Sequence, residues 1–294
     1  MQIALALVVT LVSACALNVG YLLEHSAVRT LPPLSLRRPL ASALLLVRTP
    51  RWLVGFATEG VGWALYVLAL ALAPLSIVQA TAAGGVGILA VMTARLTRVP
   101  LSQREWGAVG LAVAGLALLG ISLAGGHGEG TDPGWVPIGL WLLGSGIASA
   151  LAVRLLQQLV GAGAAFGLAT GLLFAAGDVA TKAAVADGHV VFVAALVVCY
   201  GAGTGVLQAG FQRGSPLATA GIATLLTNAL PIVAGMMLFA EPLPDGWLGA
   251  LRIAAFAAVV AGAFFLGERK HGQRGELPAG EAAEGAPDLQ PAGG

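Results

Sequence analysis

Residues 51–73 read RWLVGFATEGVGWALYVLALALA, an apolar run in which Glu59 is the one charged residue after Arg51. A helix needs about 20 such residues to cross the hydrocarbon core of a bilayer. Further runs of similar length and composition occur at 2–23, 75–97, 103–124, 135–157, 162–183, 189–210, 215–239 and 247–266. The sequence therefore predicts an all-α polytopic membrane protein, with nine transmembrane helices in a lipid bilayer.

The overall composition agrees with a membrane protein. Apolar residues make up 57% of the chain and charged residues 10%, whereas soluble domains carry about 25% charged residues. The net charge is only +1, and no basic patch with interleaved aromatic residues occurs, so we expect no nucleic-acid partner. Cys15 and Cys199 lie in apolar runs without metal-site or disulfide spacing. We expect no cofactor.

The positive charges predict the orientation of the chain in the membrane. Thirteen of the 15 Lys and Arg residues fall in alternate loops or in the tail after the last run, the exceptions being Lys182 and Arg252. Loops rich in Lys and Arg face the cytoplasm. We therefore expect a multi-pass protein of the cell (inner or plasma) membrane, with its N-terminus outside and its C-terminus in the cytoplasm.

The connection at 24–50 is long and basic, and it contains the short apolar stretch LASALLLV at 40–47. This stretch is too short to span a bilayer. Residues 39–48 are interpreted as an interfacial half-helix held by flanking arginines, or alternatively as part of a tenth span.

The chain repeats part of itself after a shift of 142 residues. The shift aligns Pro74 with Pro216, Pro100 with Pro242, Gly107 with Gly249 and Gly120 with Gly262. An odd number of helices between the copies would point them in opposite directions through the membrane. Inverted repeats of this kind build many secondary transporters, with the substrate site near the midplane between the halves.

These observations divide the chain into four parts. Residues 1–50 are expected to hold the first helix and the basic connection, and 51–124 a first repeat core of three helices. Residues 135–266 are expected to hold a second repeat of five helices, and 267–294 a disordered cytoplasmic tail rich in Gly, Ala, Pro and Glu.

Glu59 is the main candidate for a functional residue inside the membrane. It lies eight residues beyond Arg51, or roughly 12 Å into the bilayer at about 1.5 Å per residue. Helical spacing places Gly62, Trp63 and Tyr66 on the same face. An ionised carboxylate at this depth is costly, so we expect Glu59 to exchange a proton or bind a cation, which includes a metal ion. The structural alternative is a protonated Glu59 bonded to a neighbouring helix.

A second acidic residue, Asp178, has Lys182 four positions later, so the two can form an ion pair along one helix face. This pair is interpreted as interfacial, or alternatively as a gate or coupling pair on the outer side. Gln79, Gln208 and Asn228 are uncharged candidates for the lining of a polar cavity. Hydrogen bonding between helices is the alternative explanation for each of them.

Several stretches together resemble a known family. They are TEGVGWALY at 58–66, ALAPLSIVQATAAGGVGILAVMTARL at 71–96, REWGAVGLAVAGLALLGIS at 104–122 and GSPLATAGIATLLTNALPIVAGMMLFAEPLP at 214–244. This pattern resembles the drug/metabolite transporter superfamily, and within it the NIPA-like magnesium transporter branch and related bacterial exporters. In the NIPA-like pattern a Glu is followed by Asn, an aromatic residue and Tyr. Glu59, Trp63 and Tyr66 match that pattern, and Gly62 replaces the Asn.

The resemblance implies a secondary transporter that moves a small metabolite or cation by alternating access between inverted halves. Glu59 would carry the proton or cation, and a magnesium transporter is the more specific alternative. A non-transporting membrane scaffold is an alternative of another class, and the assembly, a homodimer included, stays open. We expect no enzyme, because Ser145 in Gly144-Ser145-Gly146 has no histidine in reach to act as a base.

Overall fold

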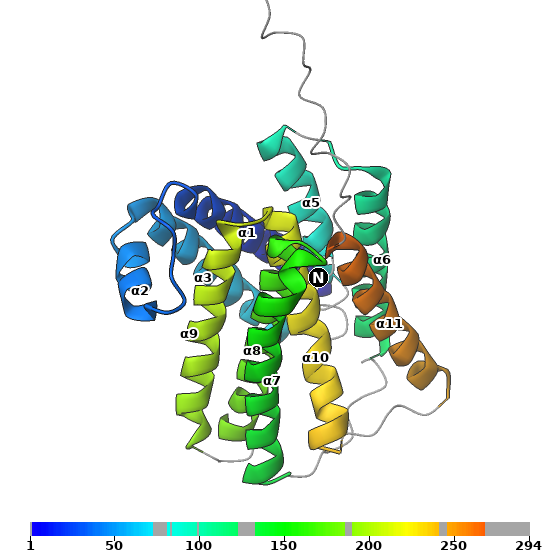
Figure 1. Ribbon diagram of the computed structural model, residues 1–294. Helices are drawn as coiled ribbons and strands as arrows, with labels where there is room; N and C mark the ends of the chain where they lie inside the picture. The colour runs from blue at the N-terminus through cyan, green and yellow to red at the C-terminus, as the bar shows by residue number, and fades with distance from the viewer. Residues whose placement is uncertain are drawn as a thin grey trace, which may run out of the picture.

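The computed structural model describes residues 2–72, 81–82, 84–98, 100–122, 133–185, 190–240 and 246–267. Over these residues the chain forms a bundle of helices (Figure 1). The α-helices are α1 (Gln2–Val28), α2 (Pro39–Val47), α3 (Pro50–Leu72), α5 (Gly84–Thr97), α6 (Gln103–Ser122), α7 (Trp135–Leu155), α8 (Ala162–Val185), α9 (Phe192–Phe211), α10 (Ile222–Leu238) and α11 (Trp247–Gly267). A 3-10 turn, η2 (Leu156–Gln158), follows α7, and a π-helical turn, η3 (Leu217–Gly221), precedes α10.

Eight helices among the described residues are long and apolar enough to cross a membrane. The apolar part of α5 is shorter, Gly84–Arg95, because most of the predicted span at 75–97 before Gly84 lies outside the described residues. The structure thus confirms an all-helical polytopic protein, with a number of spans close to the nine predicted.

Helix α1 is longer than the predicted run at 2–23 and ends only at Val28. The prediction stopped at Leu23 because the next residue, Glu24, is charged. The folded chain accommodates this residue by burying it completely and giving it a hydrogen-bond donor. The helix therefore continues toward Pro32 and Pro33, which cannot extend it.

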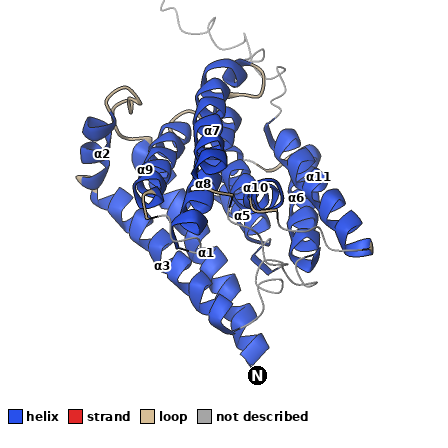
Figure 2. Cartoon of the chain, turned by 90° about the horizontal axis from the view of Figure 1, so that it is seen from below, coloured by secondary structure: helices blue, strands red, loops and turns tan. Residues whose placement is uncertain are grey.

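The expected short helix after α1 is present as α2, which begins at Pro39 and has nine residues. Proline is well suited to the first turn of a helix because the missing N–H would have no partner there. Leu40 and Leu44 are exposed, while Leu46 is buried in the core. α2 packs beside α3 and α9 at one edge of the bundle (Figure 2).

Small residues decide how closely the long helices pack. A methyl group on Gly20 would lie 2.9 Å from the backbone nitrogen of Glu59, and one on Gly62 would lie 2.8 Å from that of Leu17. Glycine thus brings the backbones of α1 and α3 into contact, and Gly167 does the same between α8 and the turn η3. Close backbone contact brings side chains from neighbouring helices into mutual reach.

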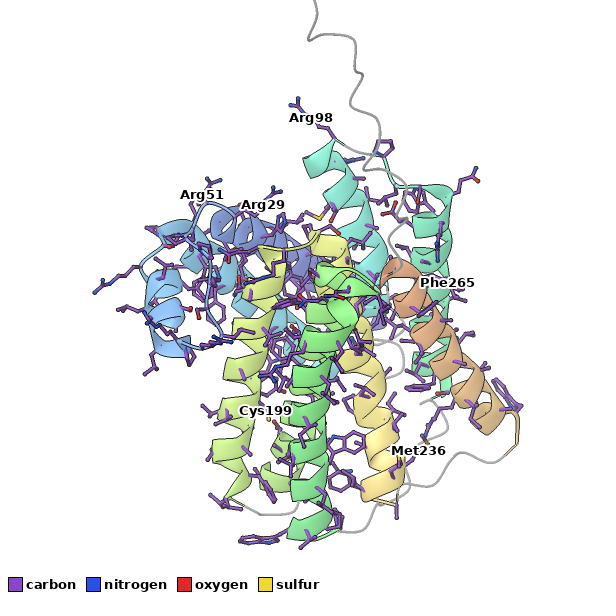
Figure 3. All side chains as sticks on the ribbon, in the orientation of Figure 1. Arg29, Arg51, Arg98, Cys199, Met236 and Phe265 are labelled. Atoms are coloured by element: carbon purple, nitrogen blue, oxygen red, sulfur yellow. The ribbon has the colours of Figure 1, made fainter. Side chains whose placement is uncertain are left out.

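The helix pairs follow the same plan in both parts of the chain. α1 packs against α3 and α5, and α8 packs in the same way against α9 and α10. α6 and α11 pack against each other on one side of the bundle, while α7 covers α8 (Figure 2). At one end of the molecule lie Arg29, Arg51 and Arg98, all from loops or helix ends that were predicted to face one compartment (Figure 3).

Candidate functional site

A cavity of about 910 Å³ lies between the two sets of helices, with walls from α1, α3, α5, α6, α8, α9, α10 and α11. Its side walls are largely apolar, from residues such as Leu17, Phe56 and Phe174. Its polar lining consists of Thr10, Ser13, Asn18, Tyr21, Glu59, Tyr66, Asp178, Thr181, Tyr200, Thr204, Thr224, Thr227, Asn228 and Arg252. A largely apolar space with a few polar groups is typical of a ligand site.

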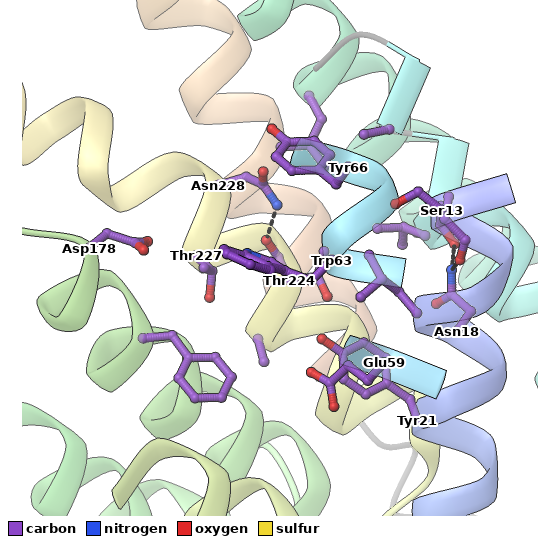
Figure 4. A pocket seen from close by; sticks show the side chains of 18 of the residues that line it. Ser13, Asn18, Tyr21, Glu59, Trp63, Tyr66, Asp178, Thr224, Thr227 and Asn228 are labelled. Carbon is purple, nitrogen blue, oxygen red and sulfur yellow. Dashed lines mark hydrogen bonds between the residues drawn. The ribbon is translucent and has the colours of Figure 1, made fainter. Parts of the chain in front are cut away.

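The structure places Glu59, Trp63 and Tyr66 together on the wall of this cavity (Figure 4). They come from one face of α3, as their spacing predicts. The indole of Trp63 is 64% exposed, so much of its surface can meet a ligand. Gly62 turns away from the cavity and faces α1, where the hydroxyl of Ser13 donates to the Gly62 carbonyl over 2.6 Å.

The hydroxyl of Tyr21 lies beside the carboxyl group of Glu59, so α1 contributes to the same part of the wall (Figure 4). Further along the wall, Asn18 binds α1 to α5, because its amide donates to the Gly85 carbonyl over 3.0 Å. Asn228 lines the cavity from α10 and donates to the Thr224 carbonyl of its own helix over 2.7 Å.

A second carboxyl group, Glu24, lies directly behind this wall. Its side chain is fully buried on α1, and its Oε2 accepts a hydrogen bond of 2.6 Å from the Nε2 of Gln208. Its Oε1 is buried without a hydrogen-bond partner among the described residues. The carboxyl groups of Glu24 and Glu59 lie close enough to act on one another.

The sequence analysis missed Glu24 because it ended the first helix at Leu23, whereas the helix continues to Val28. The signal was present, since Tyr21 and Glu24 are three residues apart and share a helix face. Gln208 was predicted to line the cavity, but the structure buries it completely and uses it as the partner of Glu24. Gln79 lies outside the described residues.

The structure shows further contacts for the two members of the predicted Asp178–Lys182 pair. The carboxylate of Asp178 lines the cavity and accepts a short hydrogen bond from the hydroxyl of Tyr200 on α9. The ammonium group of Lys182 lies 3.9 Å from the ring centroid of Phe239. Tyr200 reaches Asp178 because α8 and α9 pack closely here, where Gly177 contacts the Tyr200 ring.

A basic residue also reaches the cavity. Arg252 on α11 is buried and lines the cavity, and its Nη2 donates to the Ser122 carbonyl at the end of α6 over 3.1 Å. The sequence analysis had placed Arg252 on the outer side. The cavity therefore contains charged groups of both signs. Among the described residues no three His, Cys, Asp or Glu side chains cluster as a metal site.

Comparison with known proteins supports the family resemblance. A protein of Arabidopsis thaliana named probable magnesium transporter NIPA9 is 26% identical over 271 residues. The similarity covers 82% of this chain and 75% of the Arabidopsis protein. It confirms the resemblance to the NIPA-like branch of the drug/metabolite transporter superfamily. No protein-family model matches the chain, and no solved structure matches it.

Proposed function

We propose that this homologue of the NIPA-like proteins is a secondary transporter that carries a cation across the membrane by alternating access. Homology to a probable magnesium transporter supports a function in membrane transport. Glu59 is the group that binds the cation, and Trp63 and Tyr66 shape the space around it. The arginine-rich end of the molecule faces the cytoplasm, because loops rich in Lys and Arg lie on the cytoplasmic side of a membrane.

The observation that carries this proposal is the pair of carboxyl groups, Glu24 and Glu59, at one wall of the cavity. They come from two helices whose backbones touch at Gly20, and Gln208 and Tyr21 complete their surroundings. Two buried carboxylates repel each other unless a proton or a cation compensates their charge. A cation that enters the cavity therefore finds a concentrated negative charge at Glu59.

Alternating access requires two halves that can tilt against each other. The contact between α6 and α11 is evidence that the chain consists of two such halves. Ala112 contacts Gly262, and Gly115 contacts Val259, so the two helices cross in antiparallel directions. The same register places position 116 opposite position 258, and these positions are separated by the 142 residues of the sequence repeat. We infer a twofold axis in the membrane plane at this crossing.

The packing suggests a different division of the halves from the one expected from the sequence. α1 packs along α3 and α5 in the way that α8 packs along α9 and α10. We therefore assign α1, α3, α5 and α6 to the first half, and α8 to α11 to the second half. α7 is the connecting helix that inverts the second half.

The name of the Arabidopsis relative suggests magnesium as the substrate. The oxygen atoms that line the cavity are suitable ligands for this ion. Mg²⁺ binds oxygen ligands and keeps several of its waters when it meets only one or two carboxylates. Glu59, Tyr21 and Asn228 present oxygen atoms in a cavity of about 910 Å³, which has room for a hydrated ion. An organic cation is the second candidate, because the exposed indole of Trp63 offers a face for cation–π contact.

Uptake into proteoliposomes tests the function. We expect Glu59→Gln to lower Mg²⁺ uptake at least about fivefold, because charge attraction at about 4 Å is worth from about 1 kcal/mol in water to about 4 kcal/mol near a protein surface. Glu105→Gln is the matched control, since Glu105 is a half-buried capping residue bonded to Ser102 that does not line the cavity, and glutamine is also found at this capping position. Uptake by Glu59→Gln at the parent rate would contradict the proposal.

A further inference from the structure

The cavity is closed toward the arginine-rich end of the molecule. The last residue of α1 on its wall is Tyr21, and the last one of α9 is Thr204. Beyond these positions both helices continue toward that end, but their side chains pack against each other. Glu24, Gln208 and Phe211 are all fully buried there. A ligand in the cavity therefore cannot pass between α1 and α9 toward this end.

Hydrogen bonds between the two proposed halves hold this end closed. Gln208 donates to Glu24, and one turn later the amide of Gln212 donates to the carbonyls of Val28 (2.8 Å) and Pro32 (3.1 Å). The Oε1 of Gln212 also accepts from the backbone N–H of Leu34 over 2.8 Å. The end of α9 thus binds both the end of α1 and the chain that follows it.

Aromatic contacts reinforce the same junction. The ring of Phe211 on α9 meets the His25 ring edge-on, with centroids 5.7 Å apart, and the Tyr21 ring at 6.3 Å. His25 and Tyr21 belong to α1, so these contacts also join the two halves. Together with the Glu24–Gln208 bond, these contacts join α1 to α9 on the side of the cavity that leads to the arginine-rich end.

Toward the other end of the wall, Arg252 on α11 bonds across to Ser122 on α6, but three other polar groups of the wall bond within their own half. Asp178 accepts from Tyr200, and both belong to the second half. The hydroxyl of Thr10 on α1 donates to Ala6 of the same helix over 2.7 Å, and Asn228 donates within α10. The hydrogen bonds between α1 and α9 are therefore concentrated at the arginine-rich end.

We propose that Glu24, Gln208 and Gln212 form the gate that closes the cavity at the arginine-rich end, and that cation binding at Glu59 opens this gate through Glu24. The coupling rests on the proposed function, because it requires a cation at Glu59. The gate itself does not, since it follows from contacts between α1 and α9.

The position of Glu24 explains how one event affects the other. The carboxyl group of Glu24 lies near the carboxyl group of Glu59. It also accepts a hydrogen bond from the side-chain amide of Gln208. Its Oε1 and the Oε1 of Gln208 both lack a hydrogen-bond partner among the described residues, so the closed junction is incompletely satisfied. A cation beside Glu59 attracts the Glu24 carboxylate, which then turns away from Gln208 and releases α9.

Thiol labelling measures the gate without any transport assay. The native thiols are first removed by Cys15→Ala and Cys199→Ala, and Thr224→Cys then places one thiol on the cavity wall. A membrane-impermeant methanethiosulfonate reagent is applied from the arginine-rich side. We expect Gln212→Ala to raise the labelling rate about tenfold, because several hydrogen bonds across the junction are lost.

Gln158→Ala is the matched control, because Gln158 is exposed in η2 and lies outside the α1–α9 junction. It should leave the labelling rate unchanged. Size-exclusion profiles and thermal unfolding in detergent establish that each variant is folded, and Gln208→Leu repeats the test at the second gate position. Equal labelling of the parent, Gln212→Ala and Gln208→Leu, all folded, would overturn the gate.

Mg²⁺ alone serves as the probe for the coupling. Saturating Mg²⁺ should speed labelling of the Thr224→Cys thiol from the arginine-rich side, and Glu24→Gln should remove this acceleration. Labelling that is insensitive to Mg²⁺, in a protein that transports Mg²⁺, would overturn the coupling. If Gln212→Ala opens the gate while the parent takes up neither Mg²⁺ nor an organic cation, the gate stands and the proposed function fails.

Discussion

Replacing Gly55 with alanine tests whether close packing of α1 and α3 holds Glu24 beside Glu59. A methyl group at this position would lie 2.8 Å from the Cγ of Glu24 and 2.9 Å from its backbone nitrogen. Ordinary contact begins at 3.4 Å, so α1 would have to move away by about 0.6 Å at this crossing. The backbone atom cannot turn aside as a flexible side chain would.

Two terms of opposite sign set the expected stability change. Alanine in place of glycine inside a helix stabilises it by about 0.5–1 kcal/mol. Overpacking a well-packed contact costs about 1–3 kcal/mol. The overpacking term is larger because backbone atoms meet the new methyl group, so Gly55→Ala should be destabilised by about 1–2 kcal/mol. The separation of Glu24 from Glu59 should also lower cation uptake.

Thermal unfolding in detergent, followed by tryptophan fluorescence, measures this effect. Gly144→Ala is the control, because a methyl group on this residue of α7 would meet nothing within 4 Å. The control should unfold at the parent temperature or slightly above it, while Gly55→Ala unfolds several degrees lower. A Gly55→Ala protein as stable as Gly144→Ala would refute the close-contact argument.

Two smaller perturbations test hydrogen bonds around the cavity. Ser13→Ala removes the 2.6 Å bond to the Gly62 carbonyl, and bonds of this kind in membranes are worth about 0.6 kcal/mol on average. Its unfolding temperature should fall by more than that of Ser26→Ala, which loses a bond only within α1; an equal fall would argue against the interhelical role. Tyr200→Phe removes the donor to Asp178 and should cost about 1–3 kcal/mol by the same measurement, and unchanged unfolding would show that the hydroxyl contributes nothing.

The sequence alone determined the helical architecture because hydrophobicity and helix periodicity are local properties. Apolar runs of about 20 residues predict spans wherever they occur, and the observed helices follow them closely. The 3.6-residue period placed Glu59, Trp63 and Tyr66 on one face of α3 before any neighbour was known. The short helix α2 was equally predictable, from an apolar stretch that begins at a proline.

Only the tertiary structure decided which groups from different helices meet. The partners of Glu24 and Asp178 are Gln208 and Tyr200, and neither pairing follows from spacing along one helix. These meetings depend on helix register, which is set where glycines such as Gly20 let two backbones touch. Register is a property of two surfaces together. The pattern of a single helix can therefore predict which face carries a carboxylate, but it does not predict that the carboxylates of two helices meet.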